Sequence, residues 1–117
     1  MEKESTVLAL AALAQSTRLD AFRMLVGREP EGLPAGEIAR ELAIPHNTLS
    51  THLAILSRAG LIRSHRRSRS IIYRADLAAF RAVATFLLKD CCGGHPEVCA
   101  PLIEDLSSCF VKEVAHA

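Results

Sequence analysis

Residues 44–60 read IPHNTLSTHLAILSRAG, and the rest of the chain is organised around this stretch. Leu49, Leu53 and Leu56 recur at the spacing i, i+4 and i+7, which gives a helix one apolar stripe to bury. Gly60 follows at a position typical of the end of a helix. The stretch therefore predicts an amphipathic helix with a buried leucine face.

A shorter helix is predicted directly before it, over residues 34–43. Ile38 and Leu42 are its expected buried pair, and Pro34 suits the first turn of a helix. The brief turn at residues 43–45 would join the two helices into a helix-turn-helix.

Short polar side chains near the amino end of the second helix lie off its leucine stripe. Such side chains can form hydrogen bonds with base edges when a helix lies in the major groove of DNA. The second helix is therefore the expected reading helix, with the candidate contacts His46, Asn47, Thr48, Ser50 and Thr51. We expect His52, beside Leu53, to pack or to bond the backbone rather than to read a base.

The next residues predict a β-hairpin, or wing. Two β-prone runs, residues 61–66 and 70–74, flank a polar tip at residues 67–69. Ser68 stands at that tip, where a hairpin of this kind would be expected to carry glycine. His65 lies on the first strand, where contact with phosphate and simple exposure are equally plausible.

The basic charge of the chain is concentrated in the same region. Residues 42–75 carry six arginines and no acidic residue, whereas the whole chain has a net charge of only +1. A charged run is often just a solvated face, but beside a helix-turn-helix it favours a surface that binds phosphate. The expected phosphate contacts are Arg58, Arg66, Arg67 and Arg69.

Taken in order, these motifs resemble the ArsR/SmtB family of winged helix-turn-helix repressors. The resemblance covers roughly residues 8–90, and its motifs are STRL at 16–19, EIA at 37–39, LSTHL at 49–53, AGLI at 59–62 and residues 69–73. It implies a mainly α fold with a β-hairpin wing, binding to double-stranded operator DNA of two-fold symmetry, and a homodimer formed through the first and fifth helices.

We call the helix-turn-helix and the wing, residues 34–75, the reading head. The helices outside it have broad apolar faces. Residues 6–14 are apolar nearly all round, so this first helix needs burial on both sides, which a partner subunit would supply. Ser16 is the expected cap of the helix that follows this first one in the chain and ends at Gly27. The inward face of that helix is expected to hold Leu19, Phe22 and Leu25.

Two more helices are predicted after the wing. Asp76 caps a helix that runs to about Lys89 and has an apolar face wider than one domain core demands. Pro101 opens a final helix, whose apolar stripe is expected to be Leu102, Leu106, Phe110 and Val114. We expect two parts in the chain. Residues 1–92 form a DNA-binding and dimerisation domain, and residues 93–117 form an extension that completes a site for an inducer, the ion that would release the protein from DNA.

The chemistry of the extension lies in residues 90–99, which read DCCGGHPEVC and hold three of the four cysteines. Adjacent helical residues point about 100° apart, so Cys91 and Cys92 would not share a ligand well within a regular helix. The glycine pair that follows frees the backbone to reverse, and Pro96 stiffens the return. Cys99 can then come back over the adjacent pair.

Three converging thiolates suit trivalent arsenic or antimony, which are soft ions with a lone pair in place of a fourth ligand. If His95 supplied a fourth ligand, the site would instead suit zinc or cadmium. The thiols could also form a redox switch, with a disulfide from Cys99 to one of the adjacent pair. Cys109 lies beside apolar residues and is expected to be a buried hydrophobe.

The family resemblance narrows these alternatives. Many relatives carry a Cys-x-Cys pair on the helix before the reading helix, where this chain has neither cysteine nor histidine. Other relatives bind zinc through Asp and His on the fifth helix, which here holds no histidine. The chain therefore resembles members that sense arsenite through C-terminal cysteines.

Other classes of protein fit the sequence less well. No phosphate-cradling loop or Cys-x-x-Cys motif accompanies the thiols, so we expect no enzyme, and a metal buffer would not need an arginine-rich wing. Lys3 lies between two glutamates, which argues against a signal peptide, and no apolar run is long enough to span a membrane. We expect a cytoplasmic protein that keeps its thiols reduced and has no membrane partner.

Overall fold

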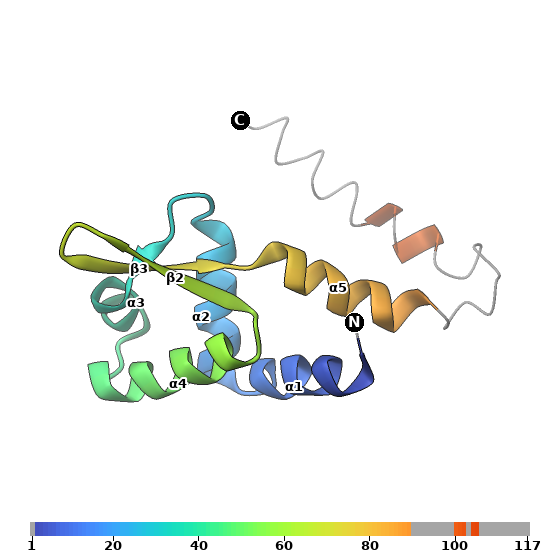
Figure 1. Ribbon diagram of the computed structural model, residues 1–117, viewed down its shortest axis with the longest axis horizontal. Coiled ribbons are helices and arrows are strands. Elements are labelled where there is room, and N and C mark those ends of the chain that lie inside the picture. Colours follow the sequence, from blue (N-terminus) through green and yellow to red (C-terminus); the bar gives the residue numbers. More distant parts are fainter. Residues whose placement is uncertain (1, 90–99, 103, 106–117) are drawn as a thin grey trace. The chain divides into compact units, whose positions relative to one another are not determined.

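A computed structural model of the chain describes residues 2–89, 100–102 and 104–105 (Figure 1). The chain divides into two units, residues 1–83 and 84–117, and the expected boundary at residue 92 lies outside the described residues. The elements in chain order are α1 (Lys3–Leu13), α2 (Ser16–Gly27), β1 (Leu33–Pro34), α3 (Ala35–Leu42), α4 (His46–Arg58), β2 (Ile62–Arg67), β3 (Ser70–Ala75) and α5 (Leu77–Lys89). The predicted fold class, mainly helical with a β-hairpin wing behind a helix-turn-helix, is confirmed.

The core of the first unit is built on the leucine stripe of α4. Leu49, Leu53 and Leu56 are each at most 2% exposed, as the i, i+4, i+7 spacing predicts. Phe22 and Leu25 of α2 are buried in the same hydrophobic core. The core therefore fixes which face of α4 points inward and leaves the opposite face to solvent.

The wing is a two-stranded antiparallel hairpin with a third, very short strand beside it. The sheet order is β1-β3-β2, and β2 pairs with β3 from Ile62 opposite Ala75 to Arg67 opposite Ser70. Strand β1 was not predicted, because two residues are too few to show an alternating pattern, and residues 28–33 look like a plain loop. At the tip, Ser68 adopts a left-handed conformation with φ 57°, the conformation for which glycine was expected.

Four details of the helices differ from the sequence predictions. Pro34 lies in β1 and is the N-cap residue of α3, not part of its first turn. Ser16 is not the cap of α2: the residue before it, Gln15, caps the helix by accepting the backbone N–H of Arg18 at 2.8 Å. Leu19 is 43% exposed, because the buried Ala21 moves the centre of the inward face of α2 farther round the helix. In α3, Ile38 is buried together with Ala39, while Leu42 is only half-buried.

The outer helices combine a packed face with an open one. In α1, Thr6, Ala9 and Ala12 are buried, whereas Val7 and Leu8 are 56% and 49% exposed. In α5, Asp76 is the predicted cap, and Phe80 makes a ring contact with Phe22 at a centroid distance of 5.6 Å while staying 42% exposed.

Little of the predicted final helix is described. Residues 100–102 and 104–105 are helical, and the remainder of its expected stripe, Leu106, Phe110 and Val114, lies outside the described residues. None of the described helices is long and apolar enough to cross a membrane.

Gly32 joins α2 to the sheet at a point of close approach. Its φ of +75° is left-handed, and a Cβ there would meet the carbonyl oxygen of Tyr73, the side chain of Arg74 at 2.7 Å and that of Ile72 at 2.9 Å. Any residue other than glycine therefore forces strain and a shift of β3.

We expect Gly32→Ala to lower the free energy of unfolding by about 2 kcal/mol or more, since strained backbone and a backbone clash add together. Urea unfolding at fixed protein concentration measures this. The matched control is Gly36→Ala in α3, where a Cβ meets nothing within 4 Å. That change should leave the stability equal or raise it by about 0.5 kcal/mol. Equal effects at the two glycines would contradict the close approach.

Candidate nucleic-acid interface

The turn between α3 and α4 is held by its own backbone. Ala43 is left-handed, with φ 55°, and its N–H donates to the carbonyl of Arg40, while the N–H of Ile44 donates to the carbonyl of Ala39 at 3.1 Å. This pattern satisfies the last carbonyls of α3 and reverses the chain without a glycine. The short turn positions the start of α4 at the surface.

The structure brings the predicted reading residues together on the exposed side of α4. His46, Asn47, Thr48, Ser50 and Thr51 are all exposed, opposite the buried leucine stripe. The first turn of α4 and the tip of the wing lie at the same end of the view in Figure 1. The polar side chains at the start of α4 and those at the wing tip are all exposed.

Three of these side chains are already ordered by the backbone of α4. The side-chain oxygen Oδ1 of Asn47 accepts the backbone N–H of Thr48 at 3.0 Å, and the Ser50 hydroxyl donates to the backbone carbonyl of His46 at 3.1 Å. The Thr51 hydroxyl donates to the carbonyl of Asn47 at 3.4 Å. These bonds leave the amide nitrogen of Asn47 as a donor and the hydroxyl oxygens as acceptors, a combination that suits base edges.

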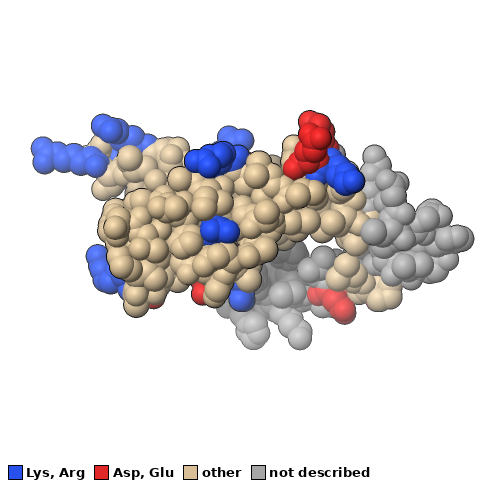
Figure 2. Space-filling model, turned by 90° about the horizontal axis from the view of Figure 1, so that it is seen from below, with Lys and Arg blue, Asp and Glu red and all other residues tan. Residues whose placement is uncertain are grey.

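The six arginines of the basic region fall into two groups. Arg63 and Arg74 each form an ion pair with a carboxylate. The other four are exposed and form no ion pair with any described carboxylate; they are Arg58, Arg66, Arg67 and Arg69. Basic side chains project from the left of the surface in Figure 2, the end at which Figure 1 places the wing tip. The four predicted phosphate contacts are thus the arginines not engaged within the described fold.

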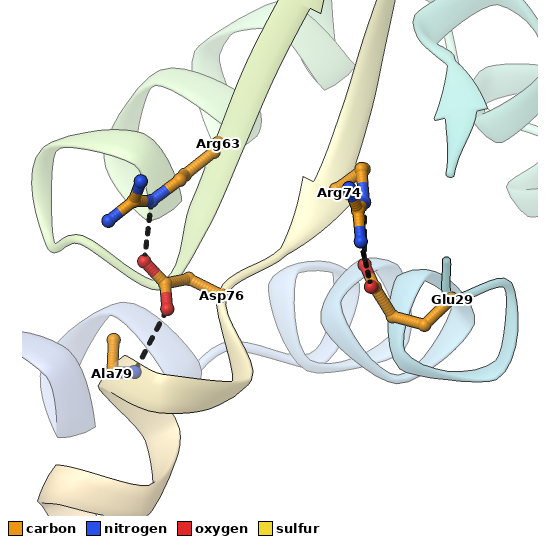
Figure 3. Close-up of polar contacts among 5 residues, drawn as sticks. All are labelled: Glu29, Arg63, Arg74, Asp76 and Ala79. Carbon is orange, nitrogen blue, oxygen red and sulfur yellow. Dashed lines mark hydrogen bonds and ion pairs between the residues drawn. The ribbon is translucent and has the colours of Figure 1, made fainter. Parts of the chain in front are cut away.

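Each of the two paired arginines at the base of the wing is neutralised by a carboxylate. Arg63 and Arg74 are directly opposite each other on β2 and β3, where like charges repel. Figure 3 shows how each is neutralised: Arg74 donates to both oxygens of Glu29, at 2.6 and 3.3 Å, and Arg63 donates to Asp76 at 2.7 Å. The hydrogen bond to Glu29 raises the pKa of Arg74 above its ordinary value.

Asp76 has two partners and so connects the wing to α5. One carboxylate oxygen accepts the N–H of Ala79 at 3.0 Å and caps the helix, and the other accepts from Arg63 (Figure 3). The hydrogen bond from Ala79, and then that from Arg63, hold the pKa of Asp76 below its ordinary value. Sequence reasoning identified the cap but missed the ion pair, whose only signal was an acid placed just after a long stretch without one.

The two histidines near this surface occupy different settings. His65 is exposed on β2. His52 is half-buried on α4, and its Nδ1 lies 3.3 Å from a guanidinium nitrogen of Arg18. This contact agrees with the prediction that His52 is not a base reader, although its partner is a side chain rather than the backbone.

The predicted inducer site lies outside the described residues. Cys91, Cys92, His95 and Cys99 all fall within residues 90–99, and Cys109 falls within 106–117. Among the residues that the structure does describe, no group of three or more His, Cys, Asp or Glu side chains is placed to hold a metal ion.

Comparisons with known proteins agree with the geometry of this surface. A helix-turn-helix domain model matches residues 13–65. The transcriptional activator HlyU of Vibrio cholerae is 33% identical over 89 residues, covering 74% of this chain and 80% of HlyU. The solved structure of that HlyU covers 78% of this chain and 99% of its own, at 29% identity and a TM-score of 0.59.

Two further structures share the fold. An ArsR-like transcriptional regulator from Rhodococcus sp. RHA1 covers 96% of this chain and 93% of its own, at 24% identity and a TM-score of 0.64. A homodimeric winged helix-turn-helix DNA-binding domain from Mycobacterium bovis covers 73% of this chain and 77% of its own, at 23% identity and a TM-score of 0.60.

Because Asp76 has a lowered pKa in the folded chain, its carboxylate stabilises the fold fully above its unfolded pKa, and this contribution is lost as the pH falls. We expect Asp76→Asn, which keeps a capping oxygen, to be less stable than the parent at pH 7 by about 0.5–1 kcal/mol. The difference should shrink as the pH falls below the ordinary pKa of an aspartate, about 3.9, and on through the lower pKa of the folded chain. Urea unfolding across this range measures it, and a constant difference would contradict the ionic role of Asp76. Asp20→Asn, at an exposed site on α2, is the control.

Replacing Arg66, Arg67 and Arg69 together with alanine should weaken binding to a DNA duplex of arbitrary sequence. The slope of log affinity against log salt should fall by about 0.9 for each phosphate that the protein no longer neutralises. Fluorescence anisotropy at several salt concentrations gives the slope. Arg23→Ala, an exposed arginine on α2, is the control for loss of charge alone. An unchanged slope in the triple variant would show that the wing does not touch the DNA backbone.

Proposed function

This chain belongs to the ArsR/SmtB family of winged helix-turn-helix transcriptional regulators, and on that premise we propose that it is a DNA-binding repressor released by trivalent arsenic or antimony. The proposal has three parts: a homodimer, an operator of two-fold symmetry and an inducer site of three cysteines. The observation that carries it is the grouping of Cys91, Cys92 and Cys99 behind a complete DNA-reading head.

Homodimer formation is supported by the open apolar faces of α1 and α5. Val7 and Leu8 on α1, and Leu77 and Phe80 on α5, are between 42% and 56% exposed. Apolar side chains exposed together on two helices are typical of a surface that binds another protein. The homodimeric relative from M. bovis supports a second copy of this chain as the partner. Two reading heads related by two-fold symmetry would require a two-fold operator.

The inducer is inferred from the chemistry of the donor set. Arsenic(III) and antimony(III) are soft and complete their coordination with three sulfurs, whereas zinc and cadmium favour a fourth ligand. Three cysteines, with a glycine pair between Cys92 and Cys99 in the sequence, would provide the three sulfurs. Zinc or cadmium bound with His95, and thiol oxidation, are the competing explanations. All three act on reduced thiols, in keeping with a cytoplasmic regulator.

The proposed direction of control, repression, differs from that of a relative. HlyU of V. cholerae is described as an activator. The same reading head serves activation or repression, because the outcome depends on where the operator lies relative to the promoter. We propose repression because an inducer that lowers DNA affinity turns genes on only when the bound protein blocks them.

Cys91→Ser, Cys92→Ser and Cys99→Ser should each bind operator DNA nearly as well as the parent, since none of the three lies in the basic region. Each should fail to be released by arsenite, because two sulfurs do not complete a three-thiolate site. The measurement is fluorescence anisotropy on a duplex selected by the parent protein from a random library, titrated with arsenite under reducing conditions. Cys109→Ser is the matched control and should respond like the parent.

Separate titrations with zinc and with a mild oxidant distinguish the alternatives. Release by zinc that His95→Ala abolishes would replace the arsenic site by a Cys3His zinc site. Release by oxidant, without release by arsenite, would replace it by a redox switch. Normal release of Cys99→Ser by arsenite would rule out the three-thiolate site.

A further inference from the structure

Arg18 lies in the first turn of α2, where the positive end of the helix dipole disfavours a cation. Its side chain reaches instead to the end of the preceding helix. The guanidinium Nε donates to the carbonyl of Ala12 at 2.6 Å, and Ala12 lies in the last turn of α1. That turn contains no basic residue of its own, so Arg18 supplies both the donor and the positive charge that the carboxyl end of α1 favours.

The same guanidinium also contacts the reading helix. Its Nη1 lies 3.3 Å from Nδ1 of His52, which is 34 positions away in the sequence and half-buried on α4. Arginine only donates hydrogen bonds, so in this contact the guanidinium is the donor and Nδ1 is the acceptor, the role that Nδ1 takes when the ring proton is on Nε2. Arg18 therefore spans from the end of α1 to the middle of α4.

This contact constrains α4 in a way that its leucine stripe does not. Apolar burial is non-directional, so the stripe distinguishes small rotations of α4 less sharply than a hydrogen bond does. A hydrogen bond depends on direction as well as distance, and the planar fork of arginine fixes two acceptors at once. His52 lies one turn after Thr48 and directly after Thr51, so a rotation at His52 re-aims the reading side chains.

We propose that Arg18 is a positioning residue for sequence-specific DNA reading: it holds the rotation of α4 by joining His52 to the end of α1. The inference rests on the proposed function in two respects, the use of α4 as the reading helix and the second copy bound through α1. Since α1 also carries the open apolar face proposed for the second copy, Arg18 sets the angle of each reading helix relative to the dimer.

The test compares affinity for a duplex selected by the parent protein from a random library with affinity for a shuffled duplex of the same length. The ratio of the two affinities cancels any loss of folded protein, so a purely structural role leaves it unchanged. Arg18→Ala should lower the ratio about 3- to 30-fold. Arg18→Lys, which keeps the charge but not the fork, should lower it as well.

Variants of His52 test the other end of the contact. His52→Asn places an uncharged acceptor oxygen near the position of Nδ1 and should retain the ratio, whereas His52→Leu removes the acceptor and should lower it. Combining Arg18→Ala with His52→Leu should lower the ratio no further than Arg18→Ala alone, because that change already removes the hydrogen bond to His52. Arg23→Ala, with an exposed arginine on the same helix, is the matched control and should keep the parent ratio.

Asn47→Ala separates failure of this inference from failure of the proposed function. If Asn47→Ala lowers the ratio and Arg18→Ala does not, α4 reads DNA and Arg18 is merely structural. If the parent protein selects no preferred duplex, the proposed function itself fails. Equal loss in His52→Asn and His52→Leu would also overturn the role of the acceptor at this position.

Discussion

Burial of the leucine stripe of α4 is the constraint on which the rest of the structure depends. Leu49, Leu53 and Leu56 must leave water together, and only the packing of the neighbouring helices and the base of the wing around them allows it. A helix with a single buried face must expose the other, and that face carries the polar residues at its amino end. Folding and DNA reading therefore place compatible demands on one helix.

Charge is divided between folding and binding in a similar way. Residues 42–75 hold no acid, yet the arginines at the base of the wing are neutralised by Glu29 and Asp76, which lie outside that range in sequence. The acids enter the fold from the loop after α2 and from the start of α5, so they hold the base of the hairpin. The tip is left with its positive charge intact, as binding to a polyanion requires.

Sequence reasoning predicted the features that repeat and missed those that depend on one tertiary neighbour. The helices, the hairpin and the cap at Asp76 follow from periodicity and local preference. Strand β1, the left-handed Ala43 and the exposure of Leu19 leave no pattern in the sequence. The reading residues followed from their spacing on α4, but the partners of Arg18 and Arg63 lie 34 and 13 positions away, and only the folded chain brings them together.

The polar contacts matter more for function than their small number indicates. The apolar core gives stability without directional contacts, whereas Arg18 and Asp76 each join an outer helix to a part of the reading head by hydrogen bonds. An inducer can lower DNA affinity only to the extent that it binds one arrangement of these parts better than another. Directional contacts help to distinguish such arrangements, because a hydrogen bond weakens steeply as it moves out of line.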